Sequence, residues 1–541
     1  MDHFSVNTYP YSLGNFKEWV LKNDYHCVYI LENGEKAYIG ESLDARRRAS
    51  EHEKKYSKLG FQRMHIITSD LMEETPAKHF EKLLIKLMKF DGKFKVINRN
   101  KGTTTHYIRV NEFELHFDKL WDRLAEMGLV KVEDFKFIMN SNAYKYSPYT
   151  TLTNEQNKVI THIRNVLASD ETEGYSSEYF RRPILINGSA GTGKTLVATS
   201  LFHYLRNHKK FGKKKIALAV ANVQMRSVLQ DVFTNTGEGL CKEDVISPIE
   251  LTKQKYDIVI CDEVHALRRD MNLWFYAKHF REGNMRLGLD NSHDELDWIL
   301  KQSEYQILFY DEKQCVKHSD IRDDYVKARI HDCPERGYRP IELKKQMRVK
   351  GGRSYVDYIY KILAQKAKSK KIFANYDFKL FTSLDDMRSE IAAKEKEYEL
   401  CRICGGYAWE WTSQKDKSAP DINIGNVEIF WNDNNKTNWV RRPDTKDEMG
   451  SMYTLRGIDM NYNGVVIGPD LYYDTQSNEI KVKKGSLFSK DVKNNATDEE
   501  IKKYVLNIYA LLLTRAIEGT YVYICDDNLK KYFQKFIESA R

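Results

Sequence analysis

The segment Gly188-Ser189-Ala190-Gly191-Thr192-Gly193-Lys194-Thr195 fits the P-loop pattern G-x-x-x-x-G-K-[ST]. An apolar strand is expected just before it, at 183–186, and a helix is expected to begin near Lys194. In this setting the glycines let backbone N–H groups turn inward around phosphate oxygens, and the helix N-terminus adds a partial positive charge. We therefore expect Gly188, Gly191 and Gly193 to cradle ATP. Lys194 would reach its β/γ-phosphates, and Thr195 would offer a hydroxyl to Mg²⁺.

Length and composition limit the class of protein. A chain of 541 residues holds about three or four domain-sized cores. The net charge of +9 permits nucleic-acid binding through local patches without demonstrating it. The eight cysteines are scattered, as in reduced proteins. No signal peptide or long apolar run is present, so we expect a cytoplasmic protein without membrane contact.

The N-terminal region reads as a small α/β unit. Two β-prone runs, 26–31 and 37–40, flank Asn33-Gly34, a strong hairpin signal. The first expected helix, from about 44 to 58, places Arg48 and His52 on one face. The second is expected to open with Thr75-Pro76 and to stop at Asp91-Gly92, with Glu81 at the margin of its apolar face.

Over residues 1–110 this pattern resembles the GIY-YIG nuclease family. Cys27-Val28-Tyr29 stands where that family has G-I-Y, and Tyr38-Ile39-Gly40 matches Y-I-G. The remaining signature residues follow in the family's order: Arg48, His52, Glu81 and Asn98. One departure is Cys27 in place of the first glycine.

The resemblance implies a role for each of these residues in phosphodiester cleavage. Glu81 would hold a single divalent metal ion, Mg²⁺ or Mn²⁺. Tyr29 and Tyr38 would surround the attacking water, with Tyr29 as the general base. Arg48 would stabilise the phosphate in the transition state, with Arg46 and Arg47 as alternative contacts. His52 would assist, and Asn98 would support the metal side.

The P-loop has two candidate partners further along the chain. An apolar strand at 256–261 ends in Asp262 and Glu263, the Walker B arrangement, in which Asp262 would hold Mg²⁺ and Glu263 would activate water. Another strand, at 306–310, runs into Asp311-Glu312-Lys313-Gln314, where Gln314 is placed to sense the γ-phosphate.

Residues 150–541 resemble superfamily 1 helicases, and most closely a bacterial family of helicase-like P-loop ATPases related to the helicase part of Schlafen proteins. Leu152 to Gln156 is similar to the Q motif, with Gln156 as the adenine reader. Motif IV corresponds to 343–348, motif V to 453–459 with Gly457 and Asp459 at the nucleotide, and motif VI to 507–516. Arg348 and Arg515 would be arginine fingers.

We thus predict an α/β chain with a small GIY-YIG nuclease domain followed by two RecA-like parallel-sheet motor domains. The expected boundaries are 1–110 for the nuclease, 111–148 for a helical linker, 149–345 for the first motor domain and 346–541 for the second.

The functional hypothesis is an ATP-hydrolysing DNA translocase or helicase that delivers a metal-dependent endonuclease, in antiphage defence or conflict between mobile elements. DNA is the preferred partner over RNA, and further copies of the chain or other defence subunits are open as protein partners. Two alternatives remain: a nuclease directed at tRNA or other RNA, and a nucleotide-gated switch that controls the nuclease without translocation.

Overall fold

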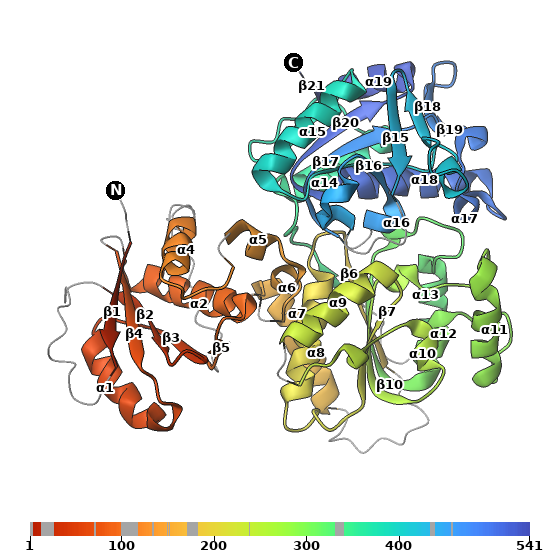
Figure 1. The fold of residues 1–541 in the computed structure, drawn as a ribbon. Coiled ribbons are helices and arrows are strands. Elements are labelled where there is room, and N and C mark those ends of the chain that lie inside the picture. Colours follow the sequence, from red (N-terminus) through yellow and green to blue (C-terminus); the bar gives the residue numbers. More distant parts are fainter. Residues whose placement is uncertain are drawn as a thin grey trace. The chain divides into compact units, whose positions relative to one another are not determined.

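The computed structural model describes residues 4–11, 26–69, 72–98, 117–132, 135–148, 150, 152–169, 182–236, 239–330, 340–432, 439–455 and 458–540. Its contacts divide the chain into two compact units, Met1–Thr151 and Leu152–Arg541. The two units are shown in Figure 1 and are described separately below.

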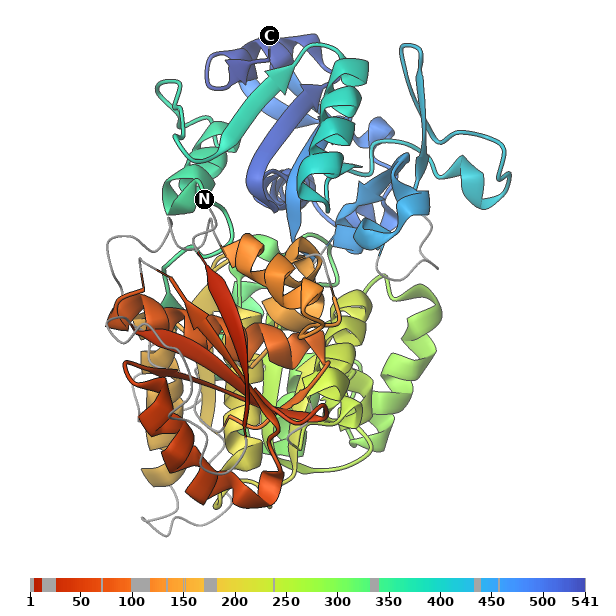
Figure 2. The ribbon, with the colours of Figure 1, turned by 60° about the vertical axis from the view of Figure 1, so that its left-hand side comes forward.

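The first unit is built on a five-stranded sheet with the order β1-β4-β2-β3-β5. The strands are β1 (Ser5–Pro10), β2 (Cys27–Glu32), β3 (Lys36–Ser42), β4 (Arg63–Thr68) and β5 (Lys95–Val96). As the Asn-Gly signal predicts, β2 and β3 form an antiparallel hairpin, and Gly34 in its turn has φ of 85°. In β2, Val28 and Ile30 belong to one core, whereas Tyr29 and Leu31 belong to another. The sheet is therefore covered on both faces, as Figure 2 shows.

Two helices cover these faces. Helix α1 (Ala45–Tyr56) contributes Ala45 and Ala49 to the core that contains Tyr29, and α2 (Glu74–Asp91) packs on the opposite face. Helix α2 begins slightly earlier than Thr75-Pro76 suggests, with Glu73 as the N-cap. Pro76 is tolerated because N–H groups in the first turn have no intrahelical acceptor. The helix ends as predicted, with Gly92 in a left-handed conformation at φ of 69°.

The segment 111–148 differs from the expected linker. Its described helices are α4 (Phe117–Glu126), α5 (Phe135–Asn140) and α6 (Asn142–Lys145). Four apolar side chains of α4 are fully buried in the core of the first unit: Phe117, Leu120, Trp121 and Leu124. Phe117 stacks on Phe80 of α2 with ring centroids 5.4 Å apart. These helices therefore complete the first unit, because α2 would otherwise expose an apolar face.

The second unit is built on two large sheets, each with its own helices. The first is six-stranded, with the order β11-β6-β10-β9-β7-β8 and parallel pairing throughout. Its strands are β6 (Arg182–Gly188), β7 (Ile216–Val220), β8 (Val245–Ile246), β9 (Tyr256–Asp262), β10 (Ser303–Tyr310) and β11 (Ile341–Leu343). Its helices are α7 (Asn154–Ser169), α8 (Lys194–Asn207), α9 (Val223–Thr236), α10 (Pro248–Leu251), α11 (Ala277–Arg286), α12 (Glu295–Gln302) and α13 (Asp323–Ile330). We call residues 152–343 the first lobe.

The second sheet has eight strands in the order β14-β15-β16-β13-β17-β20-β12-β21. They are β12 (Asp377–Phe381), β13 (Arg402–Gly405), β14 (Ile422–Ile424), β15 (Val427–Trp431), β16 (Glu448–Ser451), β17 (Met460–Ile467), β20 (Ala516–Ile524) and β21 (Glu538–Ser539). A hairpin, β18 (Leu471–Asp474) and β19 (Glu479–Val482), lies outside it. The helices are α14 (Gly352–Leu363), α15 (Leu384–Tyr398), α16 (Met452–Leu455), α17 (Lys490–Lys493), α18 (Asp498–Leu513) and α19 (Asp527–Gln534). We call residues 344–540 the second lobe.

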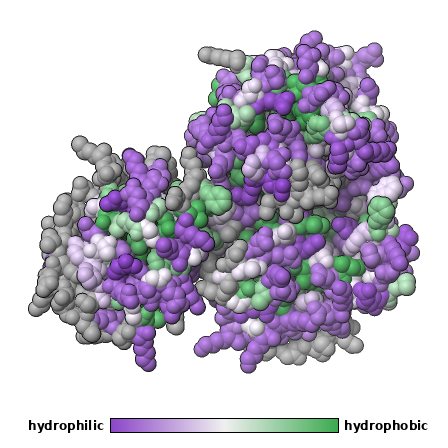
Figure 3. Space-filling model, viewed as in Figure 1, coloured by the Kyte–Doolittle hydropathy of each residue, from purple (hydrophilic) through white to green (hydrophobic). Residues whose placement is uncertain are grey.

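The surface is mainly hydrophilic on the face drawn in Figure 3, with smaller hydrophobic areas among the hydrophilic residues. Among the described helices, none combines the length and the apolar character needed to cross a bilayer.

The packing of α4 can be tested by removing its largest buried ring. Trp121 is fully buried, and its indole N–H donates to the carbonyl of Val132 at 2.9 Å. Trp121→Ala should destabilise the first unit by about 3–5 kcal/mol through cavity formation. Chemical denaturation would measure this loss. Phe137→Ala is the matched control, because Phe137 is 58% exposed, and equal stability of the two variants would contradict the packing of α4.

Candidate functional site

The P-loop lies between β6 and α8, where the pattern predicts it. Gly191 and Gly193 both have φ of 81°, a conformation that glycine adopts without strain. The Lys194 ammonium donates to the carbonyl of Gly188 at 2.7 Å and lies 3.7 Å from the Asp311 carboxylate. The Thr195 hydroxyl donates to Oδ2 of Asp262 at 2.7 Å. The loop, the end of β9 and the end of β10 therefore meet at one edge of the sheet.

Asp262 is suited to a divalent cation. It is completely buried, and burial together with the neighbouring charge of Glu263 raises the pKa of its carboxyl to about 7, against the opposing effects of Thr195 and Lys194. A bound Mg²⁺ would favour the ionised form, and a hydroxyl beside a carboxylate is the donor pair that P-loop proteins offer to this ion. Thr195 and Asp262 therefore fit the expected metal.

Glu263 is held in an unusual way. Its backbone is left-handed, with φ of 59°, which costs a residue with a side chain about 1–3 kcal/mol. Its Oε2 lies 2.7 Å from Nε2 of His265, which is fully buried. Sequence reasoning did not single out His265, although its position two residues after the carboxylate pair could have indicated it.

Gln314 joins the same network. Its amide donates to Oδ2 of Asp311 at 2.8 Å, and this oxygen also faces Lys194. The carboxylate of Asp311 thus connects the expected γ-phosphate sensor with the loop lysine.

Two side-chain carboxamides from neighbouring segments donate hydrogen bonds to carbonyls of the loop. The amide of Gln156, at the start of α7, donates to the carbonyl of Thr192 at 3.0 Å, and that of Gln346 donates to Ala190 at 2.7 Å. A Cβ on Gly193 would lie 2.4 Å from Nε2 of Gln156, and one on Gly191 would lie 2.1 Å from Oε1 of Gln346. A side chain at either position would therefore displace the carboxamide that bonds to the loop, and the φ angles of both positions also favour glycine. Adenine reading by Gln156 stays a prediction.

The two expected arginine fingers differ in their surroundings. Arg348 follows Gln346, and its Nε lies 2.6 Å from Oδ1 of Asp459, just before β17. Motifs IV and V therefore meet through this ion pair. Arg515 is buried after α18, at 2% exposure, where its charge acts on the thiol of Cys404. Gly457 lies outside the described residues.

In the first unit, three of the predicted residues come together. The Tyr29 hydroxyl and Nε2 of His52 are 2.8 Å apart, and the ring centroids of Tyr38 and His52 are 4.8 Å apart. A Cβ on Gly40 would lie 2.2 Å from the Tyr29 hydroxyl, so this strand position requires glycine. Burial raises the pKa of Tyr29 well above its usual range, and the charge of Arg48 opposes that shift. Tyr29 therefore keeps its proton at neutral pH.

Glu81 is half-buried on α2. Burial, and then the charge of Glu41, raise the pKa of its carboxyl to about 7, whereas Arg48 and Lys78 oppose this. Arg48 is exposed and pairs with Glu51 at 2.8 Å. In the described part of the chain, no three His, Cys, Asp or Glu side chains converge as a metal cluster. One carboxylate is nevertheless a known form of Mg²⁺ site when substrate phosphates complete the shell, so Glu81 fits such an ion.

Asn98 bonds to the backbone of β3. Its Oδ1 accepts from the N–H of Ile39 at 3.0 Å, and its Nδ2 donates to the carbonyl of the same residue at 2.6 Å. Asn98 thus positions the strand that carries Tyr38, and its support of the metal side stays a prediction.

The pKa of Glu81 makes its metal affinity dependent on pH. With a pKa of about 7 the carboxyl is mostly neutral at about pH 6 and mostly ionised at about pH 8, and divalent cations bind only the ionised form. Mn²⁺ affinity should therefore rise roughly tenfold per pH unit below the pKa and level off above it. Isothermal titration calorimetry with Mn²⁺, on wild type and Glu81→Gln, checks this. Equal affinity in the two proteins would exclude Glu81 as the ligand.

Comparison with known proteins gives a family match that lies within the second unit. The family model described as Schlafen group 3, DNA/RNA helicase domain, matches residues 181–526. An uncharacterized protein of Saccharomyces cerevisiae is 25% identical over 440 residues, which are 73% of this chain and 93% of the yeast protein.

Among solved structures, the Pif1 helicase from Candida albicans is 11% identical, with a TM-score of 0.27, over 72% of this chain and 98% of its own. The Arterivirus nonstructural protein 10 helicase is 13% identical, with a TM-score of 0.30, over 65% of this chain and 61% of its own. Likeness at this level carries no conclusion about fold or ligand.

Proposed function

The chain belongs to the Schlafen group 3 DNA/RNA helicase-domain family, whose model covers residues 181–526. We propose that the chain couples ATP hydrolysis on DNA, which this membership supports, to DNA cleavage by its N-terminal unit, which rests on the Tyr29, His52 and Glu81 site. The second unit is a helicase-like P-loop ATPase. The observation that carries the proposal is the network in which the P-loop contacts both carboxylate-bearing strand ends, through Thr195 to Asp262 and through Lys194 to Asp311.

Each residue of this network would have a separate task in hydrolysis. Lys194 would leave the carbonyl of Gly188 for the β/γ-phosphates, and Glu263 would deprotonate the attacking water. Mg²⁺, held by Thr195 and Asp262, would supply positive charge to the phosphate oxygens. Arg348 would exchange its ion pair with Asp459 for the γ-phosphate, so that ATP binding changes the contact between motif IV and motif V. Arg515 would be the second arginine finger.

The N-terminal unit would act as a divalent-metal-dependent GIY-YIG endonuclease. Because the pKa of Tyr29 is raised, its hydroxyl acts as a base only if its own proton moves on, and His52 at 2.8 Å is placed to accept that proton. Arg48 would face the phosphate, since its charge already acts on both Tyr29 and Glu81. The metal at Glu81 would neutralise charge that develops on phosphate oxygens.

Antiphage defence or conflict between mobile elements is the biological setting that we propose for such a fusion. The family description names a helicase domain for both DNA and RNA, which favours RNA as the alternative partner. A nuclease directed at RNA, including tRNA, is therefore the second candidate. A nucleotide-gated switch without translocation is the third.

Substitution of Glu263 should impair ATP hydrolysis more strongly than ATP binding. Glu263→Gln removes the base and should lower kcat roughly 10²- to 10⁴-fold while a fluorescent ATP analogue still binds. Lys194→Ala should also abolish turnover, whereas Lys209→Ala, an exposed lysine after α8, should behave as wild type. Phosphate release with and without single-stranded DNA or RNA measures these rates. An ATPase that neither nucleic acid stimulates would favour the switch.

DNA cleavage should depend on Glu81 without any change in ATPase rate. Glu81→Gln is expected to lose cleavage of labelled DNA in Mg²⁺ or Mn²⁺ because the metal ligand is gone. Glu74→Gln is the matched control, since Glu74 lies on the same helix and is 60% exposed. Normal cleavage by Glu81→Gln would contradict the nuclease proposal, and cleavage of RNA alone would replace DNA as the substrate.

A further inference from the structure

A short turn after the Walker B strand presents two aromatic rings to solvent. Phe275 is 99% exposed and Trp274 is 54% exposed, which is unusual for side chains of this size. Both belong to the 3₁₀ turn Trp274–Tyr276, which follows β9 in the first lobe. The exposed rings therefore lie on a segment that leaves the carboxyl edge of the sheet, where ligands of parallel sheets bind.

The backbone of this turn is strained and held in place. Asn272 and Trp274 both have left-handed φ angles, 53° and 47°, which cost about 1–3 kcal/mol each unless the surroundings impose them. Asn272 donates to the carbonyl of Asn494 at 2.8 Å and accepts from the amide of Asn495 at 2.9 Å. The Trp274 indole N–H donates to Asp491 at 2.8 Å. Hydrogen bonds to the second lobe thus hold the turn that exposes Phe275.

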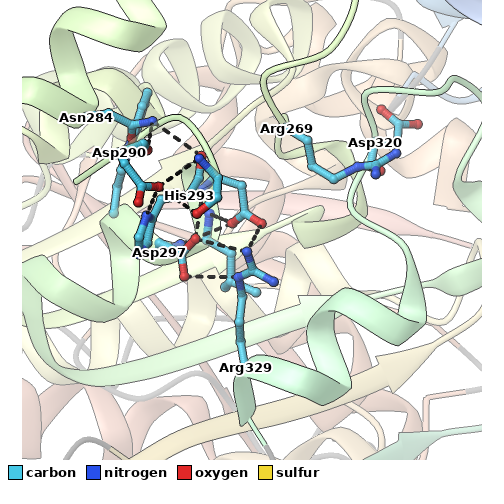
Figure 4. Close-up of polar contacts among 11 residues, drawn as sticks. Arg269, Asn284, Asp290, His293, Asp297, Asp320 and Arg329 are labelled. Atoms are coloured by element: carbon cyan, nitrogen blue, oxygen red, sulfur yellow. Dashed lines mark hydrogen bonds and ion pairs between the residues drawn. The ribbon is translucent and has the colours of Figure 1, made fainter. Parts of the chain in front are cut away.

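The other end of the turn is anchored within the first lobe. Tyr276 donates to Glu295 at 2.9 Å, and the Arg268 guanidinium stacks on its ring at 4.2 Å. Glu295 stands at the start of α12, which Arg329 secures by bonds of 2.9 Å to both Asp294 and Asp297. Figure 4 shows Arg329 and Asp297 in this cluster, with Arg269 and Asp320 nearby. Arg269 donates to the carbonyl of Asp320 at 3.2 Å, which ties the start of the segment to the loop after Gln314.

Two lysines accompany the exposed rings. Lys490 of the second lobe lies 5.7 Å from the centre of the Trp274 ring, and Phe488, two residues before it, is 41% exposed. Lys278, on the first turn of α11, is 83% exposed and pairs with Glu282 at 3.9 Å. The other nearby carboxylates are also engaged, since Asp491 accepts from Trp274 and Glu295 is buried under Arg268 and Tyr276. Aromatic rings interleaved with lysines are typical of surfaces that bind single-stranded nucleic acid.

We propose that the turn Trp274–Tyr276 is a base-stacking element for single-stranded nucleic acid, with Phe275 as the ring on which a base stacks and Lys490 and Lys278 as phosphate contacts. This inference rests on the proposed function as a nucleic-acid-dependent ATPase. A single strand is the fitting ligand because its base faces are free to stack, whereas a duplex hides them. Since bonds from both lobes hold the turn, a strand bound there contacts the junction between the lobes.

Binding of a fluorescein-labelled 12-nucleotide strand, measured by anisotropy without ATP, tests the proposal. Phe275→Ala should weaken binding roughly 5- to 100-fold, and Phe275→Trp should restore it. Ile372→Ala is the matched control, because Ile372 is 78% exposed and belongs to a different segment, in the second lobe. Wild type should also prefer a normal strand to an abasic strand of equal charge, and Phe275→Ala should lose that preference.

The outcomes separate this inference from the proposed function. If wild type binds single strands and Phe275→Ala binds them equally well, stacking on Phe275 is excluded. A protein partner would then be the ligand of the exposed turn. If wild type hydrolyses ATP but binds neither DNA nor RNA, both the stacking proposal and the nucleic-acid part of the proposed function are excluded. Thermal unfolding and binding of a fluorescent ATP analogue should be unchanged in Phe275→Ala, which confirms that its fold and nucleotide site are intact.

Discussion

The close contact of two carboxamides with the phosphate-binding loop is the constraint on which the second unit depends. Gln156 and Gln346 bond to carbonyls on the loop, and each occupies space that a side chain on Gly193 or Gly191 would need. The loop is therefore shaped by segments far away in the sequence. Because Gln346 lies two residues before Arg348, phosphate binding that moves the loop would also move the residue that contacts Asp459. In the proposed function, this chain of contacts would connect the nucleotide with the second lobe.

Both units contain a carboxyl group whose pKa is raised by its surroundings. Asp262 and Glu81 each have a carboxyl pKa raised to about 7, in both cases mainly because of burial. A carboxyl of this kind is poorly stabilised as an anion by the protein alone, so that a cation gains affinity there by supplying the missing charge. Tyr29 is a related case, because its buried hydroxyl retains its proton and relies on His52 as a neighbour.

Sequence patterns predicted the local elements well, since these depend on short-range physics. The hairpin around Gly34, the end of α2 at Gly92 and the strand before the P-loop all lie where turn chemistry and apolar periodicity indicate. The packing of the segment 111–148 was harder to predict. The burial of Phe117 and Trp121 depends on the apolar face of α2 that they cover, and no local sequence pattern indicates this contact. The start of α2 also differs, since helix ends are decided by weak capping preferences.

The sequence by itself determined the nucleotide-binding loop, the carboxylates that end neighbouring strands and the order of the two units, because each is written in consecutive residues with a strong backbone preference. Only the tertiary structure decided which side chains meet. His265 pairs with Glu263, and Arg348 pairs with Asp459. Gln346 bonds to the loop, and Phe275 is exposed. These features depend on side-chain packing and on contacts between segments that are distant in the sequence. Such contacts follow from how sheets and helices assemble in space, and spacing along the chain does not specify that.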